Sequence, residues 1–134
     1  MKRFWVTCTA VSAVVAYAHL GYAQPVSDLH RSKVCSSRST MATAGGYNGN
    51  TEMKMSNEGG WCWVNLWATR GSFQYVATYR VTKAPDHGQL AMGEVNKRTR
   101  VAYKPDAGFV GEDRYTLMDT TSNSQRLVTV TVSK

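Results

Sequence analysis

Alternating apolar and polar residues dominate the second half of the chain, and this pattern constrains the fold more than any other feature. In "SFQYVATYRVTK", residues 72–83, every second residue from Phe73 to Val81 is apolar. Shorter runs of the same kind are "TRVAYK", "RYTLMD" and "RLVTVTVSK", residues 99–104, 114–119 and 126–134. A period of two is that of a β-strand with one buried face, so each run predicts a strand.

Strand-breaking residues separate these runs at 84–88, 105–108 and 121–123, where proline, glycine, aspartate and asparagine gather. Residues 24–134 show no helical periodicity and no internal repeat. Short alternating strands at this spacing are typical of a sandwich of two sheets. The sequence therefore predicts an all-β fold.

The first 23 residues have the pattern of a secretory signal peptide. A basic head, Met1-Lys2-Arg3, precedes an uncharged stretch, residues 4–18, and small residues occupy positions 21 and 23. The stretch is too short for a typical membrane-spanning helix, although an uncleaved anchor is the alternative. We therefore expect a mature chain that starts near Gln24, has no membrane span and is periplasmic or secreted.

Removing 23 residues from 134 leaves 111, which is enough for one domain with a modest core. Residues 24–60 are rich in Ser, Thr, Asn and Gly, and they predict a loosely structured N-terminal arm with one or two short strands. Residues 61–134 are the predicted sandwich core. The mature charge, 14 basic against 9 acidic residues, is +5, which mildly favours anionic partners and does not itself indicate nucleic-acid binding.

Only two cysteines, Cys35 and Cys62, remain after the signal peptide with Cys8 is removed. Export places them in an oxidising compartment, and no C-x-x-C spacing suggests a metal site. We expect one disulfide between them.

A 33-residue segment, "HGQLAMGEVNKRTRVAYKPDAGFVGEDRYTLMD", resembles the core motif of bacterial Ig-like and cadherin-like repeat domains. That family has a His/Asn-Gly-x-Leu start, a strand that ends Tyr-x-Pro, and then Ala-Gly-Phe-x-Gly-x-Asp-x-Phe/Tyr. The matching positions are Gly88, Leu90, Tyr103, Pro105, Gly108, Phe109, Gly111, Asp113 and Tyr115. The resemblance implies an Ig-like or cadherin-like β-sandwich and a bacterial exported protein, and it does not extend before about Gly71.

Within this segment we interpret Pro105, Gly108, Phe109, Gly111 and Asp113 as a structural turn. Pro105 cannot donate to a β-ladder and so ends a strand, while glycines permit backbone angles that a Cβ resists. Phe109 is expected to close the end of the sandwich. Asp113 precedes the next strand and is expected to accept backbone N–H groups across the turn, at a cost of about 1 to 3 kcal/mol if removed.

Residues for catalysis are few, and we expect no enzyme, cofactor or metal. The mature chain keeps only His30 and His87, and no nucleophile or phosphate-loop motif is present. Two alternatives stay open. Calcium could use Asp106, Glu112 and Asp113, but the oxygen ligands are sparse, and copper(I) could use Met41, Met53 and Met55, which we interpret rather as ordinary strand residues.

Two sets of residues are candidate binding surfaces. In "GGWCWVNLWATR", Trp61, Trp63 and Trp67 share one face if Cys62, Val64 and Leu66 face the core. An exposed tryptophan row would bind sugar rings or a partner's apolar surface; the alternatives are that the N-terminal arm covers it or that the tryptophans face inward. In "NKRTRVAYK", the side chains of Arg98, Arg100 and Lys104, with Lys97 beyond them, project together as a cationic row.

The cationic row has two interpretations: it binds an anionic polymer, or its charges keep a strand edge from pairing with another molecule. With no catalytic set, the function we expect is an exported binding domain for an envelope polysaccharide or an anionic surface polymer. The alternative is a structural or inhibitory protein whose partner is another protein.

Overall fold

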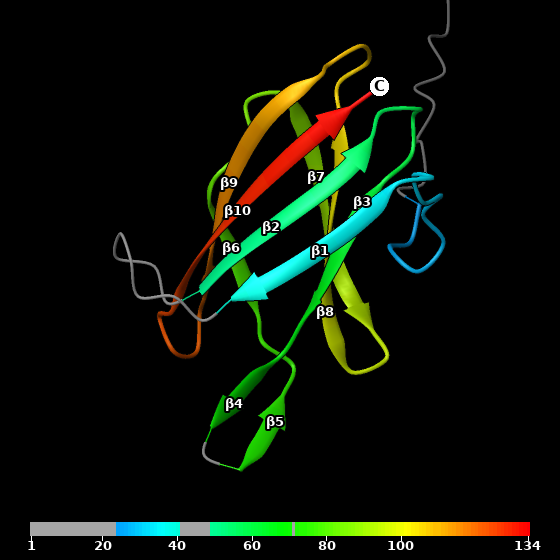
Figure 1. The fold of residues 1–134 in the computed structure, drawn as a ribbon. Helices are drawn as coiled ribbons and strands as arrows, with labels where there is room; N and C mark the ends of the chain where they lie inside the picture. The colour runs from blue at the N-terminus through cyan, green and yellow to red at the C-terminus, as the bar shows by residue number, and fades with distance from the viewer. Residues whose placement is uncertain (1–23, 41–48, 71) are drawn as a thin grey trace, which may run out of the picture.

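The chain forms two β-sheets and a short β-hairpin (Figure 1). A computed structural model describes residues 24–40, 49–70 and 72–134; the predicted signal peptide and Met41 lie outside these residues. The described residues are all-β, without a helix that could cross a membrane. The strands are β1 Cys35–Thr40, β2 Gly49–Ser56, β3 Cys62–Leu66, β4 Ala68–Arg70, β5 Phe73–Tyr75, β6 Tyr79–Lys83, β7 Gly88–Val95, β8 Arg98–Pro105, β9 Gly111–Asp119 and β10 Gln125–Ser133.

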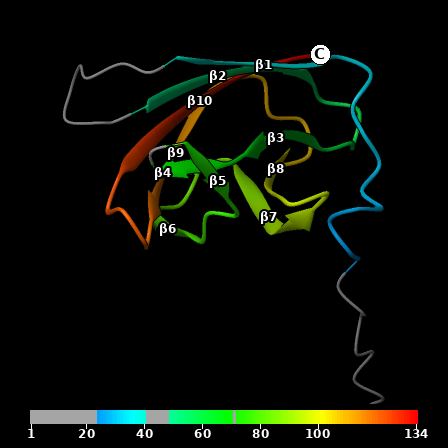
Figure 2. The ribbon, with the colours of Figure 1, turned by 90° about the horizontal axis from the view of Figure 1, so that it is seen from below.

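The larger sheet has five strands in the order β1-β2-β10-β9-β6. All neighbours are antiparallel except β2 and β10, which run parallel with Gly49 opposite Arg126. The smaller sheet has the antiparallel order β3-β8-β7. Figure 2 shows the two sheets as separate layers, with the larger one curving from β1 round to β6. The two-layer β-sandwich predicted from the alternation is confirmed.

One hydrophobic core lies between the sheets, and both sheets contribute to it. The larger sheet supplies the valines of β10, every second residue from Val128 to Val132, and Tyr115 of the neighbouring strand β9. The ring of Tyr115 stacks on that of Tyr103, which comes from β8 of the smaller sheet. The buried members of the core are Met53, Met55, Cys62, Val64, Leu66, Val101, Tyr103, Tyr115, Leu117, Val128, Val130 and Val132. The period of two read from the sequence is thus the spacing of inward-facing residues.

The segment 24–60 contributes directly to the larger sheet. Strand β2 lies between β1 and β10, and its residues Met53 and Met55 are fully buried in the core. The core therefore also includes residues that precede position 61. By contrast, β1 is almost wholly exposed; it lies at the sheet edge, and the hydroxyl of Ser39 forms a hydrogen bond with that of Thr51 on β2, 3.0 Å apart.

The continuous strand predicted over residues 72–83 is wrong, because the chain leaves the sheet in the middle of it. Residues 73–75 pair with β4 in a hairpin that projects beyond the sandwich (Figure 1), and only from Tyr79 does the chain join the larger sheet. Phe73, predicted to face the core, is 78% exposed near the tip of this hairpin. Ala77, between the two strands, is buried.

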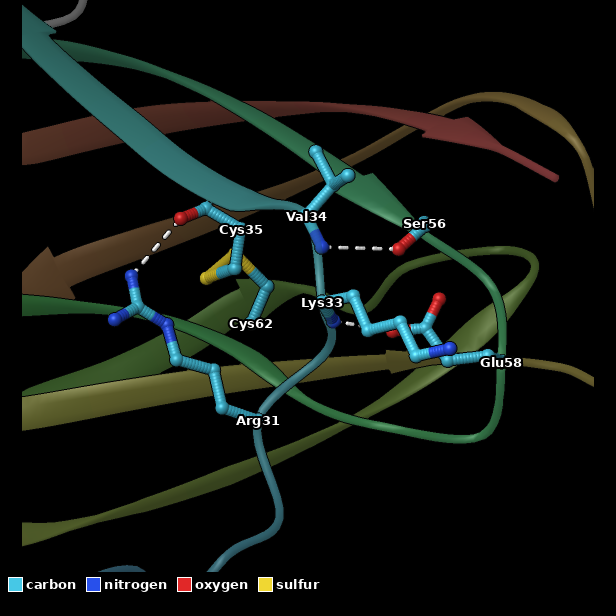
Figure 3. Close-up of a disulfide and its surroundings, with 7 residues drawn as sticks. All are labelled: Arg31, Lys33, Val34, Cys35, Ser56, Glu58 and Cys62. Atoms are coloured by element: carbon cyan, nitrogen blue, oxygen red, sulfur yellow. Dashed lines mark hydrogen bonds between the residues drawn. A yellow bond between two sulfur atoms is a disulfide. The ribbon is translucent and has the colours of Figure 1, made fainter.

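The disulfide Cys35–Cys62 joins the start of β1 in one sheet to the start of β3 in the other, with 5.3 Å between the Cα atoms. Figure 3 shows the segment before Cys35 tied to the loop after β2. The Val34 N–H donates to the Ser56 hydroxyl, 3.1 Å away, and the Lys33 N–H donates to the Glu58 carboxylate. The expected bridge is therefore present, and it fits an oxidising compartment.

Candidate functional site

Strand β3 carries tryptophans on its outer face because its other residues face the core. Cys62, Val64 and Leu66 are buried, so by alternation the residues between them point away from the core. Trp63 and Trp61 are half-buried, and Trp67, just past the end of the strand, is 44% exposed. The indoles are thus partly covered and partly open to water.

Strand β8 places its cations beside these indoles. It runs antiparallel to β3, with Asn65 opposite Arg100 and Trp63 opposite Ala102. Val101 and Tyr103 are fully buried, so Arg100 and Lys104 project from the outer face. Cross-strand diagonal neighbours lie within reach of long side chains. The two candidate surfaces predicted separately from the sequence are therefore one surface.

Each tryptophan is covered by a basic group of β8. The Nζ of Lys104 lies 5.8 Å from the ring centroid of Trp61. The guanidinium carbons of Arg100 and Arg98 lie 4.4 Å and 4.6 Å from the ring centroids of Trp63 and Trp67, respectively. These are cation–π contacts, which stabilise and orient the cation. Lys97 lies exposed in the turn beyond Arg98.

A fourth cation, Arg31, comes from the N-terminal segment. Its guanidinium carbon lies 5.4 Å from the Trp63 centroid, and its Nη2 donates to the carbonyl of Cys35 at 2.9 Å (Figure 3). Residues 30–32 pair with Trp61 in a short parallel bridge, with the Trp61 N–H donating to the His30 carbonyl at 2.8 Å. We name Trp61, Trp63, Trp67, Arg31, Arg98, Arg100 and Lys104 the tryptophan–cation ladder. Sequence reasoning missed Arg31, because no alternation connects it to β3.

Arg100 is held in place on three sides. Besides its stacking on Trp63, its Nε donates to the Asn65 side-chain oxygen at 3.2 Å and its Nη1 donates to the Val26 carbonyl at 3.1 Å. Gly93 makes room for this segment, because a Cβ at that position would lie 2.6 Å from a methyl carbon of Val26. The N-terminal segment therefore covers part of the outer face near β7 and leaves Trp67 and Arg98 open.

The ladder carries positive charge, and no acidic side chain in the described ranges forms an ion pair with it. Among the described residues the one ion pair joins Arg114 to Glu112, 2.6 Å apart, on strand β9 of the other sheet. Glu94 of β7 pairs with Thr99 of β8, which is on the inner face of the smaller sheet. Glu94 therefore does not share the outer face with the ladder. The segments outside the description contain no Asp or Glu. The outer face of β3 and β8 is therefore a surface that attracts anions.

The turn residues lie at the opposite end of β8 from Arg98 and are occupied by internal contacts. Pro105 ends β8, and Gly108 and Gly111 have φ angles of 79° and 139°, which favour glycine. Phe109 packs against the core, and its ring stacks on His87 with 4.4 Å between centroids.

Asp113 is buried and accepts four hydrogen bonds. The donors are the N–H groups of Asp86, His87 and Arg114, at 3.0, 2.8 and 2.9 Å, and the hydroxyl of Tyr103 at 2.9 Å. Burial alone would raise the pKa of Asp113, but these donors together lower the pKa below its ordinary value. Burial and the same carboxylate raise the pKa of Tyr103.

Residues considered for metal binding or catalysis lie apart from each other. His30 and His87 are exposed at separate places, and Met53 and Met55 point into the core. No group of three or more His, Cys, Asp and Glu side chains comes together in the described ranges.

Comparison with protein-family models, curated proteins and solved structures found no match to the chain. The function is therefore inferred from the surface itself.

Proposed function

We propose that the chain is a non-enzymatic, exported binding domain that holds an acidic polysaccharide of the cell envelope on the tryptophan–cation ladder. One observation carries this proposal: four basic side chains lie over three indoles on one sheet face, and no described carboxylate forms an ion pair with them. A ligand with repeated negative charges would complete this arrangement.

An anionic ligand fits better than a neutral sugar chain. A guanidinium lies over Trp63 and another over Trp67, so these indoles are already used by cations. Arg98 is exposed, and its described contact is the stacking on Trp67, so its N–H donors remain for a ligand. Residues on one face of a strand are about 7 Å apart, because every second residue points the same way. Arg98 and Lys104 are six residues apart along β8, so the row spans about 20 Å. That length suits an extended polymer.

We also propose that the fold is of the Ig-like or cadherin-like type and that residues 1–23 are a cleaved signal peptide. Supporting the fold type are the motif of residues 87–119 and the parallel pairing of β2 with β10 beside antiparallel β9 and β6. Supporting export are the leader pattern and the Cys35–Cys62 disulfide. If both proposals hold, the ladder belongs to an exported protein that can meet envelope polymers.

The test uses the mature protein, residues 24–134, with polygalacturonate as the acidic polymer and dextran as the neutral one. We expect binding to polygalacturonate that weakens steeply with salt, because bound cations displace counterions. Arg98→Ala and Arg100→Ala should each lower the affinity and reduce the slope of log affinity against log salt by about one. Arg80→Ala, which removes an exposed arginine of β6 in the other sheet, is the matched control and should change neither.

Equal binding of dextran and polygalacturonate, or unchanged binding when Arg98, Arg100 and Lys104 are all replaced, would contradict the proposal. The alternative function, binding of another protein, is favoured by the projecting hairpin. Phe73 is 78% exposed there and Val76 is also exposed. If a partner protein from envelope extract is lost with Phe73→Ala and kept with Arg98→Ala, the alternative holds.

A further inference from the structure

The sandwich interior changes character at the end where β10 begins. Along β10 the inward positions 128, 130 and 132 are valines, but the next inward position is Arg126. On β9 the inward residue at the same end is Asp119, which is buried, whereas Arg126 is half-buried. A cavity of about 480 Å³ opens here, and its walls include Arg126, Asp119, Tyr75, Tyr79 and Trp67.

The guanidinium of Arg126 is fixed at the wall of this cavity. Its Nη1 donates to the hydroxyl of Thr51 at 3.1 Å. It lies against Gly49, where a Cβ would be only 2.9 Å from the central guanidinium carbon. Gly49 does not have a positive φ, so the backbone does not require glycine there. The absence of a side chain instead leaves room for the guanidinium. Arg126 is therefore held where a longer residue on β2 would displace it.

No acidic group neutralises Arg126 among the described residues, and the remaining segments contain no Asp or Glu. Asp119 is nearby but engaged elsewhere. Its carboxylate accepts from the Tyr75 hydroxyl at 3.1 Å, the Ser122 hydroxyl at 2.9 Å and the Thr121 N–H at 2.9 Å. A half-buried arginine without an anionic partner costs free energy that a bound anion would recover.

Part of the remaining wall is aromatic, beside polar residues such as Ser39, Asn65 and Ser122. Tyr79 is half-buried, and its burial raises the pKa of its phenol. Trp67 and Tyr75 extend the aromatic surface toward the mouth. The volume lies within the range of small-molecule sites, which combine apolar walls with a few fixed polar groups.

We propose that this cavity binds a small organic carboxylate, with the carboxylate on Arg126 and a ring-sized body against Tyr79 and Trp67. The site differs from the outer face of the ladder, although Trp67 borders both. It does not depend on the proposed polymer function. The same carboxylate chemistry could come from an aromatic acid or from a uronic acid, so the experiment includes one of each.

Titration calorimetry of the mature protein would compare benzoate with benzyl alcohol and D-glucuronate with D-glucose. At least one acid should bind ten times more tightly than its neutral counterpart. The acid that does so shows whether the ligand is an aromatic acid or a uronic acid. Arg126→Gln should weaken that binding at least tenfold. Gly49→Ala should have the same effect, because it moves the guanidinium without removing it. Arg80→Gln should leave it unchanged, and Arg126→Gln should leave polygalacturonate binding unchanged.

If neither acid binds more tightly than its neutral counterpart, the proposal is overturned. It is also overturned if binding survives Arg126→Gln in a protein whose circular dichroism and melting match the parent. Because polygalacturonate binding is measured on the same samples, failure of the cavity proposal is distinguishable from failure of the ladder proposal.

Discussion

Replacing Asp113 with alanine tests whether the segment between Tyr103 and Tyr115 is architecture or a binding site. The substitution leaves four donors without their acceptor: three backbone N–H groups and the Tyr103 hydroxyl. A hydrogen bond to a charged group contributes about 1.5 to 3 kcal/mol. Four bonds to one carboxylate are not additive, and two of the donors belong to exposed residues, Asp86 and His87. We therefore expect a loss of about 3 to 5 kcal/mol in the free energy of unfolding, above the 1 to 3 expected from the sequence.

The pH dependence of this loss has a definite sign. The pKa of Asp113 is lower in the folded protein than in the unfolded chain, where an aspartate has a pKa of about 3.9. Its ionic contribution is therefore complete above about pH 4 and is lost as the pH falls through the folded-state pKa. The difference in stability between parent and Asp113→Ala should be largest at neutral pH and should shrink progressively in acid.

Urea unfolding followed by tryptophan fluorescence, at neutral and acidic pH, measures both quantities. Glu112→Ala is the control: Glu112 is the exposed neighbour that pairs with Arg114, so its loss should change stability by no more than about 0.5 kcal/mol. A parent-like unfolding free energy for Asp113→Ala, or a difference that does not change with pH, would refute the reasoning. Normal stability with lost polygalacturonate binding would make the segment a binding site.

Two further predictions concern stability. Replacing Cys35 and Cys62 with alanine should lower the free energy of unfolding by about 3 to 4 kcal/mol, because the bridge closes a sequence separation of 27 residues; intact mass without reductant must first show no free thiols in the parent. Gly88→Ala should lower the free energy of unfolding by at least about 1 to 3 kcal/mol. The new Cβ would lie only 2.5 Å from the ring of Tyr103 and 2.6 Å from the Lys104 carbonyl. A melting temperature equal to the parent's would count against either prediction.

The alternation predicted the inward-facing residues of β8, β9 and β10, since period two follows directly from strand geometry. The same pattern failed at residues 72–83, because it does not record where a strand leaves its sheet. Phe73 and Val81 share the alternation, yet one is at an exposed hairpin tip and the other in the larger sheet. Strand β1 had no apolar signal at all; its pairing with β2 and the Cys35 bridge hold it in place.

The ladder shows a second limit. The sequence indicated the tryptophans and the cations separately, but the pairing of Asn65 with Arg100 depends on how β3 and β8 meet, which neither strand encodes alone. Arg31 and the Arg126 cavity arise from segments far apart in the chain. Local patterns thus predicted faces of strands, while the site depended on long-range register.

The parallel ladder between β2 and β10 also determines when the protein can fold. β10 is the last strand of the chain and lies at the middle of the larger sheet, between β2 and β9. Until residues up to Ser133 have emerged, β1 and β2 have no strand to join them to β9 and β6, and closing so long a loop is slow. A chain that has not yet gained β10 therefore cannot complete the larger sheet, and its two parts, β1-β2 and β9-β6, stay unjoined.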